Sequence, residues 1–150
     1  MTRTCSIPED KALFFPVVNS ITFNTPNVCG QGPADLPIRE LRATSAEFIK
    51  GVANLSVELD GNKIERVRHV RSELFEVALP EDNVFDSVCA VPARIYSPSV
   101  DEGFYVLLHP LKAGNHLLTF HAENTTTNFI EEVTYTLAVV PVQTTRPRQD

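Results

Sequence analysis

The segment Gly103–Ala122, GFYVLLHPLKAGNHLLTFHA, gives the clearest indication of the fold class. It holds two runs rich in β-branched, aromatic and leucine side chains, Gly103–His109 and Asn115–Ala122, which is the composition of β-strands. The five residues between them, Pro110–Gly114, include the proline and glycine that favour a turn. A further strand-like run, Glu131–Val140, follows. This part of the sequence therefore predicts a β-meander.

A β-hairpin is predicted upstream of the meander. In Asn54–Leu59 polar and apolar residues alternate, as they do in a strand with one buried face. Asp60 and Gly61 form the residue pair of a tight hairpin turn, and the return strand is expected to begin near Lys63. The same kind of pattern predicts two further short strands, at Leu74–Leu79 and Ala93–Tyr96.

The N-terminal third supplies another strand region and a helix. Lys11–Phe23, KALFFPVVNSITF, is largely apolar, and Pro16 in its middle predicts an edge strand or two short strands. One amphipathic helix is predicted near residues 37–50, and Gly51 is suited to end it. Its inward stripe recurs at helical spacing: Ile38, Leu41, Ser45, Phe48 and Ile49.

Strands at intervals of about ten residues, with one helix and no strand–helix alternation, predict a mainly β fold. We expect an antiparallel β-sandwich, Ig-like or jelly-roll-like, with a closed barrel as the alternative. A chain of 150 residues can bury a core of its own, so we expect a single domain over residues 1–150. The two ends, through Ile7 and from Thr144 to Asp150, are expected to fray.

Charge and composition limit the classes of partner and the cellular compartment that we expect. The chain carries 19 acidic and 13 basic side chains, and its net charge of −6 opposes binding to nucleic acid or anionic lipid surfaces. No apolar run approaches the length of about 20 residues that spans a bilayer. The first residues lack the apolar stretch of a secretory signal, so the chain is either cytoplasmic or has lost a leader. An early cysteine and eleven prolines favour the second interpretation, a secreted or extracytoplasmic protein.

Three cysteines, Cys5, Cys29 and Cys89, allow one disulfide and one free thiol, or no disulfide in a reducing compartment. Cys5 and Cys29 are the candidate pair. The spacings match neither a Cys-x-x-Cys zinc site nor a redox dithiol.

The N-terminal region carries the pattern Cys-x-Ile-Pro-x-x-Lys-Ala-x-x-Phe-Pro-x-x-Asn, which here runs from Cys5 to Asn19. This pattern resembles an uncharacterised family of secreted bacterial β-rich proteins. The similarity extends over most of the chain, through Leu41–Ala43, Leu79–Asn83, Asp101–Leu111, Gly114–His116 and Val133–Tyr135. The resemblance implies secretion and a β fold, and it carries no known activity and no catalytic residues. It also implies a trimmed or divergent member, because the family has a signal peptide and another Cys before this point, which would explain the odd thiol count.

The candidate ligand-binding residues are Lys11, Asn19, Tyr105 and His116. Lys11 and Asn19 flank the apolar N-terminal strand region, where they either face a cleft or mark the strand ends. The amphipathic ring of Tyr105 suits a sheet core or a platform for a sugar. His116 is expected on the inward face of its strand, at the mouth of the core.

Two sets of side chains are candidates for metal binding. His109, His116 and His121 lie across one predicted hairpin, but strand alternation places His116 and His121 on opposite faces, which favours structural roles. Asp82 and Asp101 lie in acidic segments that offer oxygen ligands to calcium. Since an Asp side chain in a turn more often accepts hydrogen bonds from the backbone, Asp82 and Asp101 are weak candidates for calcium binding, and no cofactor is expected.

The sequence contains no short motif that brings a nucleophile and a base together. We therefore expect a non-catalytic extracytoplasmic binding domain, with an unknown extracellular molecule as its partner. One alternative is a small hydrolase or isomerase that uses His116 with Asp82 or Asp101 as acid and base. A second alternative is a homo-oligomer that assembles through an exposed edge strand at Phe14–Val18.

Overall fold

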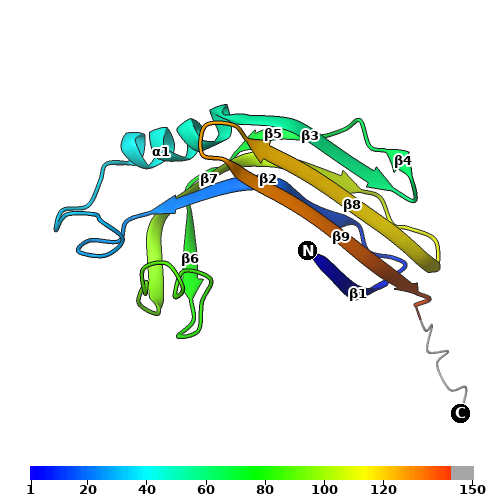
Figure 1. Ribbon diagram of the computed structural model, residues 1–150. Coiled ribbons are helices and arrows are strands. Elements are labelled where there is room, and N and C mark those ends of the chain that lie inside the picture. The colour runs from blue at the N-terminus through cyan, green and yellow to red at the C-terminus, as the bar shows by residue number, and fades with distance from the viewer. Residues whose placement is uncertain (143–150) are drawn as a thin grey trace, which may run out of the picture.

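The computed structural model describes residues 1–142, which form two β-sheets packed face to face and one helix (Figure 1). Sheet A has the strand order β1 (Thr2–Pro8), β9 (Phe129–Val140), β8 (Gly114–Asn124), β3 (Val52–Leu59) and β4 (Asn62–Lys63). Sheet B has the order β2 (Leu13–Phe23), β7 (Arg94–Leu108) and β5 (Arg68–Arg71), and β6 (Phe75–Leu79) also pairs with β7. The predicted mainly β sandwich with one helix is confirmed.

The core lies between the inner faces of the two sheets, because alternate residues of each strand point inward. In β8 the inward residues Leu118, Phe120 and Ala122 are buried, and they share one core with Val57 of the neighbouring strand β3 and Val106 of β7 in the opposite sheet. Each fully buried Val, Leu or Phe contributes about 1.5–3 kcal/mol to the stability of the fold. The hairpin prediction also holds, since Asp60 and Gly61 both have positive φ between β3 and β4.

The helix α1 (Ile38–Lys50) lies across β2 and β7 and covers the part of sheet B that sheet A leaves open (Figure 1). Leu41, Ser45 and Ile49 of the predicted stripe are buried. The hydroxyls of Ser45 and Thr22 are hydrogen-bonded at 2.6 Å, which ties the helix to β2. The helix of the described residues lacks the length and apolarity needed to cross a membrane.

The N-terminal end differs from the prediction. Residues up to Ile7 were expected to fray, but they form β1, which pairs with β9 in parallel. Thr2–Pro8 is polar and mostly exposed, so its strand conformation comes from backbone bonding to the edge of β9 rather than from burial. The sheet is therefore not wholly antiparallel. The other end expected to fray, Thr144–Asp150, lies outside the described residues.

The predicted cysteine pairing is wrong. Cys29 pairs with Cys89, with their Cα atoms 5.2 Å apart, and Cys5 is free and exposed. The physical reason is location, since Cys5 lies in β1 of sheet A, whereas Cys29 and Cys89 lie in two loops next to sheet B. The disulfide joins these loops over a second, smaller core that contains Phe23 and Tyr96.

Candidate functional site

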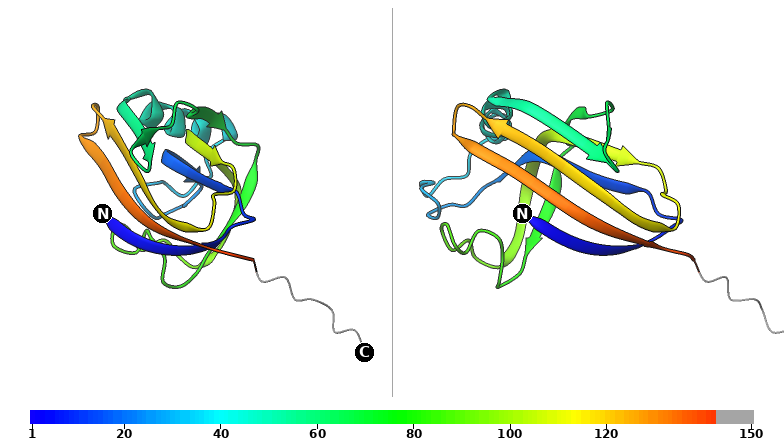
Figure 2. Two further views of the ribbon diagram at one scale, coloured as in Figure 1. Left: turned by 90° about the vertical axis from the view of Figure 1, so that its right-hand side faces the viewer. Right: turned by 45° about the vertical axis from the view of Figure 1, so that its right-hand side comes forward.

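A cleft opens between the two sheets on the side where β1 and β2 are their edge strands. In the described chain β1 pairs only with β9, and β2 only with β7. Figure 2 shows sheet A curving down to β1 at its lower edge. The cleft has a volume of about 340 Å³, which is at the low end of the range for small-molecule sites.

The floor of the cleft is aromatic and apolar. The rings of Phe15 from β2 and Phe120 from β8 are stacked across it, with centroids 5.5 Å apart and planes 29° apart. Phe120 in turn faces the ring of Tyr135 from β9, at 6.4 Å. Buried Leu118 and Val133 complete the floor from sheet A. An apolar ligand placed here would therefore lose water on two sides, which is the main source of affinity in such sites.

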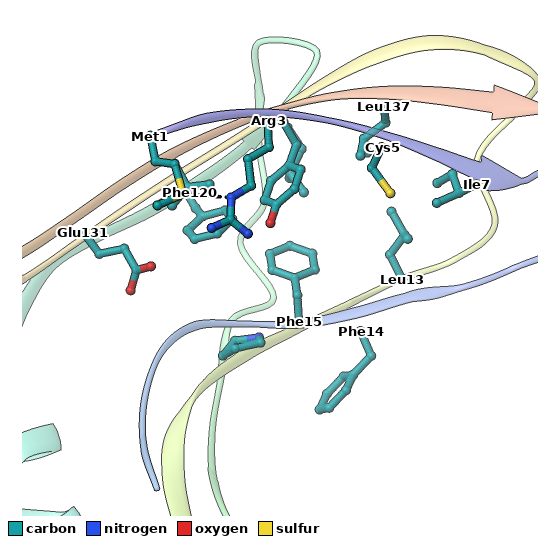
Figure 3. A pocket seen from close by; sticks show the side chains of 14 residues that line it. Met1, Arg3, Cys5, Ile7, Leu13, Phe14, Phe15, Phe120, Glu131 and Leu137 are labelled. Carbon is teal, nitrogen blue, oxygen red and sulfur yellow. Dashed lines mark hydrogen bonds between the residues drawn. The ribbon is translucent and has the colours of Figure 1, made fainter. Parts of the chain in front are cut away.

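Polar groups are gathered at one end of the cleft (Figure 3). Arg3 and Tyr135 are direct partners in the β1–β9 register, and both line the cleft. The Nε of Arg3 donates to the Met1 sulfur at 2.8 Å, and the ion pairs among the described residues do not include Arg3. Glu131 also lines this end, and burial raises the pKa of its carboxyl. Within residues 1–142 the guanidinium of Arg3 therefore has no carboxylate partner, and it lies at the edge of an apolar space.

Three of the residues singled out in the sequence meet on the outer face of sheet B, away from the floor of the cleft. Asn19 donates its side-chain N–H to Asp101 at 2.7 Å, and the Tyr105 hydroxyl donates to the other oxygen of Asp101. Burial and this hydrogen bond raise the pKa of the Tyr105 phenol. A side chain on Gly103 would lie 2.5 Å from the Cβ of Asn19, so the glycine leaves room for the network. As ligand-binding residues, Asn19 and Tyr105 remain a prediction.

His116 lies on the inward side of β8, as the alternation predicts, but its hydrogen-bond partners belong to two adjacent turns rather than to the cleft. Its Nδ1 donates to Asp60 at 2.7 Å and its Nε2 donates to the Lys112 carbonyl at 2.9 Å. The hydrogen bond to Asp60, followed by the one to Lys112, raises the pKa of His116. Asp60 also accepts from the backbone N–H of Leu117 at 2.8 Å. His116 therefore fastens the β3–β4 turn to the β7–β8 connection.

The remaining candidates are dispersed. Lys11 is exposed and pairs with its neighbour Asp10 at 3.4 Å, in the connection between β1 and β2. Asp82 is exposed in the loop after β6, far along the chain from Asp101 in β7. Among residues 1–142, no three His, Cys, Asp or Glu side chains are grouped closely enough to hold a metal.

Sequence reasoning missed the cleft. Arg3, Cys5 and Ile7 alternate along β1 toward it, and Glu131 to Leu137 do the same along β9. The alternation Arg3–Cys5–Ile7 was the available signal, but it is too short and too polar to predict a strand without its neighbour β9. A second hollow of about 610 Å³ lies beside the disulfide and is more open to solvent. We consider the cleft between the sheets the better site because it is more enclosed.

Neither the family models, nor the curated proteins, nor the solved structures contain a match to this chain.

Proposed function

We propose that this chain is a non-catalytic, extracytoplasmic binding domain that holds a small ligand in the cleft between β1 and β2. The observation that carries the proposal is the cleft itself, a concave apolar space with aromatic side chains on its floor and a few polar groups at one end. This combination is typical of small-molecule sites.

The location outside the cytoplasm is supported by the disulfide between Cys29 and Cys89, which lie 60 residues apart. Disulfides of this structural kind persist in oxidising compartments and are rare in a reducing cytosol. The resemblance of the Cys5–Asn19 pattern to secreted bacterial proteins points the same way, and we propose membership of that family on this ground.

A binding role is favoured over the enzyme alternative by the surroundings of His116. Both of its ring nitrogens are engaged, one by Asp60 and one by the Lys112 carbonyl. A general base needs a free ring nitrogen directed at its substrate. Of the acids considered with it, Asp101 is bonded to Asn19 and Tyr105 instead.

Self-assembly is the second candidate, favoured by one observation. The strand β2 is an edge of sheet B, and its Phe14 is 66% exposed. Two features act against edge-to-edge pairing: Pro16 removes a backbone donor from β2, and Arg3 places a charge on the inward side of β1. We therefore rank it below ligand binding.

The proposal is tested by titrating the oxidised protein with N-phenyl-1-naphthylamine, a neutral apolar dye whose fluorescence rises on leaving water. We expect saturable binding at one site. Cys5→Trp should lower the affinity at least about tenfold, because Cys5 is an exposed residue of the cleft wall where a larger ring fills the space. The matched control is Thr4→Trp, next in the chain but outside the cleft lining, which should bind like the parent protein. Absence of saturable binding, or equal loss in both variants, would contradict the proposal.

A further inference from the structure

The cleft is polar at one end and apolar at the other. Figure 3 shows Met1, Arg3 and Glu131 toward one end, and Cys5, Ile7, Leu13 and Leu137 toward the other. The gradient follows from strand geometry, because β1 and β9 run parallel and their inward residues change from polar to apolar in the same direction. Tyr135 lies four positions after Glu131 along β9, and Leu137 lies two positions further, so the gradient extends over about 20 Å.

The polar end is suited to an anion. Arg3 presents a planar set of N–H donors, and such a set matches the two oxygens of a carboxylate. Tyr135, its partner across the β1–β9 pair, adds a hydroxyl donor, and the Tyr135 ring packs against Phe120. Neither the Arg3 guanidinium nor the Tyr135 hydroxyl is bonded to an acidic side chain within residues 1–142.

Glu131 is the one acidic side chain among the described residues that line the cleft, and its charge would oppose an anionic head. Its carboxyl is half-buried, and this burial disfavours the charged form. The register places Arg3 level with Tyr135, four residues along β9 from Glu131. This spacing is about 13 Å along the strand between the two Cα positions. Among the described residues, no ion pair joins the Arg3 and Glu131 side chains.

We propose that the cleft binds a free single-chain amphiphile with a carboxylate head, held by Arg3 and Tyr135, and with its hydrocarbon chain lying over Phe15 toward Ile7 and Leu13. The inference rests on the proposed function and specifies its ligand class. The volume of about 340 Å³ suits one chain rather than a lipid with two. The net charge of −6 also disfavours docking on an anionic membrane surface.

The test compares three probes of equal chain length: dodecanoate and dodecyltrimethylammonium below their micelle concentrations, and 1-dodecanol below its solubility limit. Each is measured by displacement of the neutral dye and by calorimetry. We expect dodecanoate to bind about tenfold or more tightly than the other two, because only its head forms a charge-assisted pair with Arg3. Arg3→Gln should remove this preference and leave the affinity for 1-dodecanol unchanged. The matched control is Arg68→Gln, an exposed arginine of β5 outside the cleft.

The outcomes separate this inference from the proposed function. Equal affinity for the three probes, or an unchanged preference in Arg3→Gln, overturns the carboxylate head and leaves the apolar cleft as the ligand site. Binding to phosphatidylglycerol vesicles without binding of monomeric dodecanoate also overturns it. Failure of the neutral dye and of all three probes overturns both proposals together.

Discussion

Two aromatic clusters of this molecule differ in whether the chain covers them. In the second core, Phe23 is 8% exposed and Tyr96 is 3% exposed, under two loops that the Cys29–Cys89 disulfide joins. Among residues 1–142, the cleft is lined by strand residues and Met1, and Phe14 at its border is 66% exposed. Similar side chains thus form a closed core where loops fold over a sheet, and an open site where two unpaired edges face each other.

Aromatic content alone therefore does not identify a binding site in this molecule, whereas the absence of loops over the rings does. Both clusters involve β2, whose residues Phe14 and Phe23 lie nine positions apart on the same strand. One end of β2 is covered by the loops and the other borders the cleft. If this contrast is correct, changes in the second core should affect stability, and changes at the cleft should affect ligand affinity.

The largest expected effect comes from truncating a ring at each end of β2. Phe23→Ala should lower the free energy of unfolding by about 3–5 kcal/mol, because it removes contacts with Phe85 and Tyr96 and leaves a cavity. Phe14→Ala should cost about 1 kcal/mol or less, since its ring is exposed and loses only its stacking on Tyr105. Denaturant unfolding followed by circular dichroism measures both. Comparable losses would mean that the two ends are not distinguished by coverage.

The next effect concerns the disulfide that holds the loops over the second core. Replacing Cys29 and Cys89 together by Ser should lower the free energy of unfolding by about 2–5 kcal/mol, because the crosslink restricts the unfolded chain. Cys5→Ser serves as the control, and its change should lie within about 0.5 kcal/mol, since this thiol is exposed. The dye affinity of the double variant, measured below its unfolding transition, should match that of the parent protein. A large loss of affinity would show that the second core and the cleft are coupled.

Several elements of the fold were accessible from the sequence because their signal is local. The stripe of α1 placed Leu41, Ser45 and Ile49 inward, and all three are buried. The alternation in Asn54–Leu59 and the Asp60–Gly61 turn likewise correspond to β3 and the start of β4. Such patterns depend on the period of the backbone, which short segments determine by themselves.

The site was less accessible, because it arises from contacts between distant segments. The strand β1 forms only because β9, more than 120 residues later, offers a free edge. Arg3 therefore looked like part of a frayed end, although it faces the cleft. Likewise, pairing of Cys29 with Cys89 depends on two loops meeting over Phe23, which cysteine spacing does not encode.

The smallest expected effect tests the polar end of the cleft through pH. Burial raises the pKa of Glu131 in the folded state above its value in the unfolded chain, so the folded protein binds this proton more readily. Stability from this group should therefore be lost as the pH rises through the raised pKa, and gained as the pH falls toward the ordinary value near 4.5. Glu131→Gln should remove that slope and raise stability at pH 7 by less than about 0.5 kcal/mol.

The control for this change is Glu132→Gln, which removes the same charge from the adjacent, exposed residue on the other face of β9. Unfolding midpoints at pH 5, 6 and 7 would give the pH dependence of stability for each variant. These pH values lie in the range of about 4 to 7, where carboxyls with a raised pKa titrate. If both variants keep the slope of the parent protein, Glu131 is as well hydrated as a surface carboxylate. The cleft would then be wetter at this end than its lining indicates, and the pairing of an anionic head with Arg3 would be correspondingly weaker.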